Sequence, residues 1–543
     1  MVFARRSTTL LAAIIASCAM VLSLTACTSD NKTVVDGQTT VTSNSAGGVA
    51  VFTPSDGITL NQQTPLNKWA KLVPDLAKAL ADAGFKKGDI DHTTSDSLAK
   101  QSRAIQDFVV DHLSNNTTDD SGIAIAPDNM TLLVAPVVEA DASTRQYGDY
   151  ISQNLSTNDA TDEGATSDGE SSEDDSSKDD SSNTESDSTA SDEQAQAVDR
   201  LVSSLKLAKE SGMHVVLLGN SIEGYKPDAF VKFSDAQTIG KLQAEKMVSK
   251  LKLDKASKDN PKYIEVLLPY TAVDEKGNAN DSTFAQEAFR GIWQVLGSYY
   301  QKGVVESPSG TLDGKSTEND WQAVAYDAAE EGSTAKVLDK RLAKTDGQST
   351  LTRIDGIITM NDYIASEVVK ELDDLGYTGS AADINPQITI SGIVGNITGK
   401  KDLSRDAVPD PIKSPENDNA NDSSSSDDDA DEDTSASDKD RDSQWPLVTG
   451  YGAYVSNIPS IVNGKQWMTG MEDRQTIATD IAQACAKLNK DEALNSMPSI
   501  RNSEVGGVKK IPTISEPLLA VSASNLKSAL IDPGYISLAD AGL

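Results

Sequence analysis

Residues 208–220 read Ala-Lys-Glu-Ser-Gly-Met-His-Val-Val-Leu-Leu-Gly-Asn, and this passage contains the pattern that recurs along the chain. An amphipathic segment ends at Gly212, and a continuous apolar run then begins at His214. Glycine commonly ends helices because it adopts positive φ without strain. Uninterrupted Val/Leu runs are typical of strands buried on both faces of a parallel sheet. The passage therefore predicts a helix leading into a buried parallel strand.

The same alternation extends outward from this passage in both directions. Apolar runs occur at 49–53, 131–138, 214–219, 229–233, 263–269, 354–360, 388–393 and 446–449, and amphipathic segments at 68–83, 196–211, 238–251, 282–302, 321–342, 363–375 and 477–488. Alternating strands and helices predict parallel sheets with helices on both faces. We expect an α/β protein with two doubly wound lobes, at 49–235 and 236–445. Residues 446–543 are expected to form hinge-crossing and closing segments shared between the lobes.

Two acidic stretches interrupt this alternation and account for much of the net charge of −35. Between Asp159 and Glu193 there are 14 acidic residues and one lysine, and between Glu416 and Asp442 there are 12 acidic and two basic residues. Such Ser-rich, charged segments cannot bury enough apolar surface to fold. We expect disordered insertions at about 154–195 and 403–443. The chain has no basic stripe of the kind that nucleic acids require, so no nucleic-acid partner is expected.

The N-terminus has the features of a bacterial lipoprotein signal. Arg5 and Arg6 precede the apolar stretch 10–24, and Leu24-Thr25-Ala26-Cys27 matches a lipobox. We expect a signal peptide at 1–26, lipidation of Cys27, a flexible tether at 27–48, and a lipid anchor on the extracytoplasmic face of the cell membrane. The alternative is an ordinary signal peptide with a cysteine there by chance.

Residues for catalysis or metal binding are scarce. The chain has three histidines, and Cys485 is the only cysteine outside the N-terminal segment. A His/Cys metal site and a Cys-His dyad are therefore disfavoured. Glu223 stands where a nucleophile elbow needs glycine, and Val394 departs from the P-loop pattern. We expect no enzymatic activity, no metal and no cofactor.

Residues suited to carbohydrate binding lie just beyond the expected strands and at the start of the first helix. In open α/β sheets, ligands bind beyond the carboxyl ends of the strands. Aromatic faces pack on sugar rings, while carboxylate, amide and ammonium groups hydrogen-bond sugar hydroxyls. The candidate ligand-binding residues are Phe52, Lys68, Trp69, Asn220, Tyr270, Asn361, Asp362 and Tyr451. Each aromatic taken alone is also compatible with a place in the core.

Several motifs occur in an order found in one known family. They are Leu66-Asn67-Lys68-Trp69, residues 208–216, Gly240-Lys241-Leu242-Gln243-Ala244, Met360-Asn361-Asp362, 446–450 and 464–469. In this order they resemble the type 1 periplasmic sugar-binding proteins, especially the xylose-binding and multiple-sugar-binding branch. The resemblance implies a monomer with two lobes that close on a sugar at the hinge and present it to the permease of an ABC importer. It also implies that Lys68 and Trp69 contact the sugar from the first lobe, and Asn361 and Asp362 from the second.

Three positions depart from the family pattern. Asn220 follows a strand where the family often has Tyr-Asp, Gly452 replaces an aspartate, and Phe284 stands near the position of an asparagine. Glycine supplies no side chain, so the expected pocket is less acidic and more apolar than a standard monosaccharide site. Two hypotheses follow: a substrate-binding lipoprotein that delivers a carbohydrate to an ABC importer, or a sensory or scaffold lipoprotein that has kept the fold with altered or lost binding.

Overall fold

The computed structural model describes residues 34–35, 38–39, 46–55, 65–115, 125–138, 144–156, 184–273, 280–343, 351–381 and 443–543. The chain divides into two compact units, Met1–Asn44 and Ser45–Leu543. In the first unit, β1 (Val34–Val35) pairs antiparallel with β2 (Gln38–Thr39). Cys27 and the rest of the signal segment lie outside the described residues, so the lipoprotein assignment stays a prediction.

Within the second unit, the first lobe is built on a seven-stranded sheet of order β17-β18-β9-β7-β5-β3-β4. All neighbouring strands are parallel except β17 and β18, which are antiparallel. The strands are β3 (Gly48–Pro54), β4 (Ile90–Ser95), β5 (Met130–Val134), β7 (His214–Leu218), β9 (Ala229–Val231), β17 (Ile500–Val505) and β18 (Val508–Ile514).

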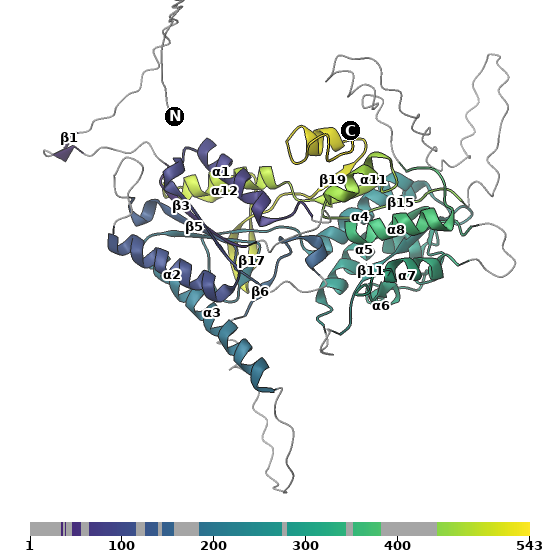
Figure 1. Ribbon diagram of the computed structural model, residues 1–543, viewed down its shortest axis with the longest axis horizontal. Coiled ribbons are helices and arrows are strands. Elements are labelled where there is room, and N and C mark those ends of the chain that lie inside the picture. The colour runs from purple at the N-terminus through teal and green to yellow at the C-terminus, as the bar shows by residue number, and fades with distance from the viewer. Residues whose placement is uncertain are drawn as a thin grey trace, which may run out of the picture. The chain divides into compact units, whose positions relative to one another are not determined.

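Helices cover both faces of this sheet (Figure 1). Val49 and Val51 face a core formed with α1 (Trp69–Asp82) and α12 (Arg474–Leu488). The alternate residues Ala50 and Phe52 face a core formed with α2 (Leu98–Asn115) and α3 (Thr184–Glu210). Successive side chains of a strand point to opposite faces, so a strand covered on both faces is apolar throughout.

The second lobe has a four-stranded parallel sheet of order β12-β10-β14-β15. One core joins this sheet to α4 (Ala236–Leu251) and α5 (Thr283–Gln301), and another joins it to α7 (Ser333–Arg341) and α8 (Asp362–Leu375). Two short strands, β11 and β13, pair beyond the main sheet. The strands are β10 (Lys262–Val266), β11 (Leu268–Pro269), β12 (Val305–Glu306), β13 (Ala325–Tyr326), β14 (Gly356–Ile358) and β15 (Leu447–Val448).

The chain crosses between the lobes three times. Residues 232–235 connect β9 to α4, residues 472–473 connect β16 (Met468–Met471) to α12, and residues 515–518 connect β18 to β19 (Leu519–Ser522). β16 and β19 pair antiparallel, and a fifth core packs them against α11 (Ile458–Val462) and the closing turn at Lys527–Ile531. The C-terminal part of the chain therefore contributes to both lobes, through α12, β17 and β18 in the first and β15 and β16 in the second.

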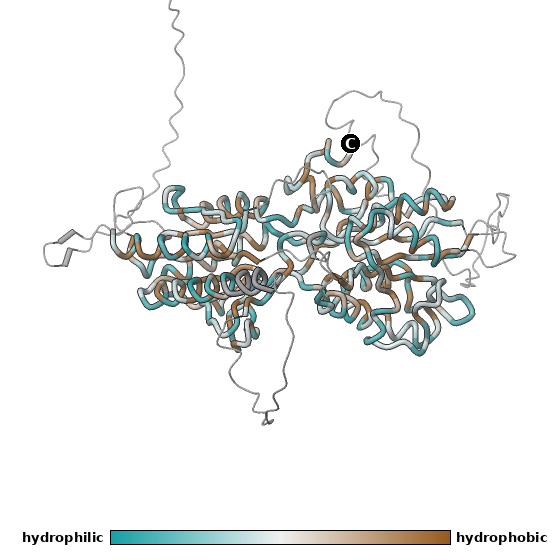
Figure 2. The backbone as a smooth tube through the Cα atoms, turned by 60° about the horizontal axis from the view of Figure 1, so that its bottom comes forward, coloured by the Kyte–Doolittle hydropathy of each residue, from teal (hydrophilic) through white to brown (hydrophobic). Residues whose placement is uncertain are grey.

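The predicted fold class is confirmed: the protein is α/β, with two lobes built on parallel sheets. Long helices alternate between hydrophilic and hydrophobic residues along their length in Figure 2, the period on which the prediction depended. The first insertion differs from the prediction at both of its ends. The short strand β6 (Asn154–Leu155) and the start of α3 at Thr184 both fall inside the stretch assigned to the first insertion. The rest of that insertion, most of the second insertion and the apolar run 388–393 lie outside the described residues.

Within the part of the chain that the structure describes, no helix is both long and apolar enough to cross a membrane.

Candidate ligand site between the lobes

Trp69 and Lys68 begin α1 on the first lobe, but neither presents an open surface. The Trp69 side chain is only 3 % exposed and packs edge-on against Tyr150 and Phe233, with ring centroids 5.1 and 5.7 Å away. Lys68 Nζ lies 2.6 Å from Asp149 Oδ1. The Trp69 backbone N–H donates to the second oxygen of the same carboxylate over 3.0 Å. Trp69 is therefore part of an aromatic core, and Asp149 occupies the polar end of the helix.

The other two first-lobe candidates, Phe52 and Asn220, are also buried within the lobe. The Phe52 ring is buried on the α2 face of the sheet, where it meets Phe108 edge-on at 5.7 Å. Asn220 is buried, and its amide donates to Pro136 O over 2.9 Å while its Oδ1 accepts from Gln153 N over 2.9 Å. These contacts hold the loops that follow β5 and β7 together.

Asn361 and Asp362 lie where β14 passes into α8, and both are fully buried. Asn361 Oδ1 caps α8 by accepting from Ile364 N over 2.9 Å, which is the usual role of asparagine before a helix. Asp362 accepts from Gln466 Nε2, Tyr454 N and Thr469 Oγ1 over 2.7–2.9 Å. Burial raises the pKa of Asp362 to about 6, although these hydrogen bonds act to lower it.

Tyr451 belongs to a buried network between two of the crossovers. Its hydroxyl lies 2.7 Å from Ser234 Oγ, and Glu472 Oε1 accepts from Ser234 N over 2.7 Å. Ser234 lies in the first crossover and Glu472 in the second. Burial raises the pKa of Glu472 to about 7. Tyr451 therefore links the hinge segments, and its ring is fully buried.

Tyr270 remains accessible on the second lobe. It follows β11, is partly buried, and meets Trp321 edge-on with ring centroids 5.1 Å apart. Its backbone N–H donates to Tyr326 O of β13 over 2.9 Å. Beside it, Thr271 Oγ1 donates to the exposed Asp327 carboxylate over 2.9 Å. A pair of partly exposed aromatic rings thus lies beside hydroxyl and carboxylate groups at the carboxyl edge of the sheet.

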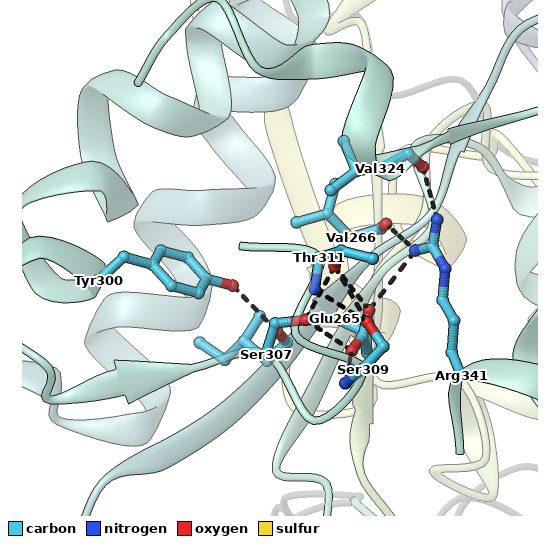
Figure 3. A network of polar contacts seen from close by, with 9 residues as sticks. Glu265, Val266, Tyr300, Ser307, Ser309, Thr311, Val324 and Arg341 are labelled. Atoms are coloured by element: carbon cyan, nitrogen blue, oxygen red, sulfur yellow. Dashed lines mark hydrogen bonds and ion pairs between the residues drawn. The ribbon is translucent and has the colours of Figure 1, made fainter. Parts of the chain in front are cut away.

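A buried ion pair connects two segments of the second lobe that lie close in sequence to this aromatic pair (Figure 3). The Arg341 guanidinium donates to Val266 O over 2.6 Å and to Val324 O over 2.9 Å, which ties the end of β10 to the start of β13. Glu265 lies 3.4 Å from the same guanidinium, and its carboxylate accepts from Ser307 Oγ over 2.6 Å. Because the chain supplies all the partners of this network, it is not itself an open site.

The sequence reasoning missed Gln146, Tyr147 and Asp149, which lie between the lobes. Asn361 Nδ2 donates to Gln146 Oε1 over 3.1 Å, and Tyr454 OH donates to the Gln146 backbone oxygen over 2.6 Å. The one local signal is the run Gln-Tyr-Gly-Asp-Tyr at 146–150, which places two aromatics around a glycine directly before an acidic stretch. Trp321 has no sequence signal of its own either, because it begins a segment whose period predicts an amphipathic helix.

Among the described ranges, no group of three or more His, Cys, Asp or Glu side chains is arranged to hold a metal ion. The expectation of no metal and no enzymatic activity stays a prediction.

The comparisons with known proteins concern structure alone. No known family model matches the sequence, and a search of curated proteins finds no match. An ABC transporter solute-binding protein from Clostridium phytofermentans with bound β-D-glucose is 16 % identical, with 91 % of this chain and 99 % of that chain covered and a TM-score of 0.43. A carbohydrate transporter solute-binding protein from Chloroflexus aurantiacus in complex with D-glucose is 17 % identical, with coverages of 92 % and 98 % and a TM-score of 0.43.

A sugar ABC transporter protein from Actinomyces odontolyticus is 10 % identical, with 89 % of this chain and 97 % of that chain covered and a TM-score of 0.43. Similarity at this level leaves the ligand of the present chain to be argued from its own residues.

Proposed function

We propose that this chain is an extracytoplasmic solute-binding lipoprotein that captures a carbohydrate between its two lobes and delivers it to an ABC importer. The observation that carries the proposal is the partly exposed Tyr270–Trp321 pair at the carboxyl edge of the second-lobe sheet. Aromatic faces suit the C–H surface of a sugar ring, and the neighbouring Asp327 carboxylate accepts hydrogen bonds from hydroxyls.

The connections between the lobes support the same proposal. Each lobe has its own cores, and three short crossovers join them. Elements that are separately packed and linked by a few loop residues are suited to hinge closure around a ligand. Ligand binding between two such lobes therefore changes the distance between them, and a membrane partner can recognise that change.

A thermal-shift screen of the purified chain tests the proposal. D-Glucose, D-xylose and short oligosaccharides are added at about one hundred times the dissociation constant, where binding stabilises the folded form by about 2.7 kcal/mol. At about 2–4 °C per kcal/mol, the midpoint should rise by several degrees. The proposal fails if no carbohydrate raises it.

Two tryptophans of the second lobe provide a matched pair of variants. Trp321 and Trp293 are both partly buried, but Trp293 stacks on Phe289 and Tyr300 in the helix core. Trp321→Ala should abolish the ligand-dependent shift. Trp293→Ala should lower the midpoint without ligand and leave the shift intact. Equal ligand shifts in both variants would place the sugar elsewhere.

A second candidate function is a sensory or scaffold lipoprotein without small-molecule uptake. The observation in its favour is that Trp69, Asn361 and Asp362 are buried and already bonded within the chain. This function takes precedence if the carbohydrate screen is negative while the protein is folded and anchored at the membrane.

A further inference from the structure

The stretch Gln146–Tyr150, called here the cleft segment, contacts both lobes. Its first two residues, Gln146 and Tyr147, contact the second lobe, and its last two, Asp149 and Tyr150, contact the first. Between them, Gly148 has a φ of +99°, and a Cβ there would lie 2.5 Å from Asn67 O. The turn of the cleft segment against the first lobe therefore requires glycine.

Charge and helix capping anchor the cleft segment on the first lobe. α1 has no side-chain cap from its own Lys68, and Asp149 takes that role with the two bonds to Lys68 Nζ and Trp69 N. A carboxylate at a helix N-terminus is favoured by the helix dipole. Asp149 N also donates to Asn67 O over 2.8 Å, and the Tyr150 ring stacks on Phe233 at 4.6 Å.

The contacts with the second lobe are neutral. Gln146 accepts one hydrogen bond from the Asn361 amide and one from the Tyr454 hydroxyl. The Tyr147 ring packs against Phe284 at 4.7 Å and Tyr451 at 6.2 Å, and its side chain is 1 % exposed. No ion pair links Gln146 or Tyr147 to the described residues of the second lobe.

The hydroxyl of Tyr147 is fully buried and makes no hydrogen bond of ordinary geometry, although the Asn361 side chain lies near enough to lower the pKa that burial raises. A buried hydroxyl left unpaired weakens the state that contains it. The hydrogen bonding of buried polar groups is thus less complete in the second-lobe half of the cleft segment than in the first-lobe half.

The cleft segment bonds to the positions expected to hold a ligand. Lys68 and the Trp69 amide bind its Asp149 carboxylate, and the Asn361 amide binds its Gln146 side chain. We propose that the cleft segment is an internal competitor for the ligand site: it fastens the lobes together in the absence of ligand, and carbohydrate binds when Gln146 and Tyr147 leave the second lobe. This inference rests on the proposed function and extends its ligand site on the second lobe from Tyr270 and Trp321 to Asn361.

Release occurs at the second lobe because the first-lobe contacts include a salt bridge and a helix cap. The ligand therefore competes with Gln146 for Asn361, while Asp149 stays on α1. Apparent affinity is proportional to the fraction of molecules in which the cleft segment is released, so it is low while that fraction is small. Variants that weaken the second-lobe contacts should bind ligand more tightly than the wild type.

The distance between the lobes tests this proposal without any ligand. Spin labels are placed at Lys206→Cys on α3 and Lys370→Cys on α8, which are both exposed, in a background without the two N-terminal cysteines. Cys485 is buried, and burial raises the pKa of its thiol, so it should not react with the label. Gln146→Ala and Tyr147→Ala should shift the distance distribution measured by pulsed EPR toward larger separations.

Tyr147→Phe is the matched control, because it keeps the ring and removes only the unpaired hydroxyl. Its distance distribution should not shift toward larger separations than that of the wild type. Gln146→Ala removes one side-chain hydrogen bond and so keeps the test valid if Tyr147→Ala fails to fold. Unchanged distributions in folded Gln146→Ala and Tyr147→Ala would overturn the proposal.

Titration calorimetry with D-glucose and a panel of monosaccharides then measures the competition. Tyr147→Ala should bind its sugar on the order of tenfold more tightly than Tyr147→Phe. If the lobes separate in the alanine variants but no sugar binds any variant, the internal contact is supported and the carbohydrate function fails. If a sugar binds all variants equally and the lobe distance is unchanged, the carbohydrate function is supported and the internal competitor fails.

Discussion

The two lobes differ in how fully the chain itself occupies the candidate ligand-binding residues. On the first lobe, the polar end of α1 is bonded to Asp149, and Trp69 is enclosed by Tyr150 and Phe233. On the second lobe, the polar side chains of Asn361 and Asp362 are also occupied, but Tyr270 and Trp321 stay partly exposed.

This difference shows that an aromatic residue at the start of a helix has no fixed role. Trp69 stabilises its lobe because other rings enclose it, whereas Trp321 meets the ring of Tyr270 and stays partly exposed. Substitutions that separate stability from binding are the most direct tests of the comparison.

Replacement of Trp69 should have the largest effect on stability. Trp69→Ala opens a cavity among buried rings and should lower the free energy of unfolding by about 3–5 kcal/mol. Trp321→Ala removes less buried area and should lower it by about 1–2 kcal/mol. Urea denaturation measures both values. Equal losses would mean that the two tryptophans are equally buried in solution, and the comparison would fail.

Asp362→Ala should come next, because it removes the acceptor of the buried Tyr454 N–H and one hydrogen bond each from the Gln466 amide and the Thr469 hydroxyl. We expect a loss of about 3 kcal/mol in the free energy of unfolding. Asp373→Asn is the control, since Asp373 is 54 % exposed and bonds only to Lys465 among the described ion pairs. That change should stay within about 0.5 kcal/mol. If Asp362→Ala changes the free energy of unfolding only slightly but abolishes sugar binding, Asp362 is a ligand contact.

The hinge network should make stability depend on pH. The pKa of Glu472 is raised from 4.5 to about 7 by burial. Since the folded state holds its proton more tightly than the unfolded state, this contribution is full below pH 4.5 and is lost as the pH rises toward 7. Glu472→Gln mimics the protonated side chain. The variant should gain stability relative to the wild type across this window, as measured by the thermal midpoint from pH 4.5 to 8. A constant difference would show that Glu472 does not titrate there.

Removal of the acidic insertions should affect both lobes little. Deleting 159–180 from the first lobe or 416–442 from the second shortens a surface connection, and each doubling of loop length changes the closure free energy by about 0.6 kcal/mol. Differential scanning calorimetry of the two deletions should give nearly wild-type midpoints. A fall of more than a few degrees in one deletion only would show that this insertion packs on its lobe.

Cys27→Ser should leave the stability of both lobes unchanged, because the predicted lipid is attached outside them. The variant should instead move from the membrane fraction to the soluble or uncleaved pool, as followed by fractionation and immunoblotting. Wild-type partitioning of the variant would contradict lipid anchoring.

The parts of the fold that follow from local periodicity were predictable. The runs at 49–53 and 214–219 became β3 and β7, and the segments at 238–251 and 363–375 became α4 and α8. The start of α3 at Thr184 was not, because its first turns have the same Ser-rich, acidic composition as the insertion before them. Composition alone does not separate a charged helix end from a charged loop.

The candidate site was predictable only in outline. Strand ends pointed to Asn361 and Asp362, whose role as ligand contacts stays a prediction. The sequence did not indicate that Asn361 is separated from its partner Gln146 by 215 residues. Likewise, nothing local to Lys68 reveals Asp149, which lies 81 residues further along the chain. The competition between cleft segment and ligand depends on such pairs.

By itself, the sequence determined the helices and strands with clear apolar periodicity and the two-sided burial of those strands, because apolar periodicity acts over a few neighbouring residues. That periodicity did not indicate β4 or α2. The tertiary structure alone decided which polar side chains are hydrogen-bonded within the chain and which aromatic rings stay partly exposed. Trp69 and Trp321 each begin a helix, and only the packing of distant segments encloses one and leaves the other partly exposed. Hydrogen bonds and burial depend on distances in space, and these are set by how the lobes and the cleft segment pack.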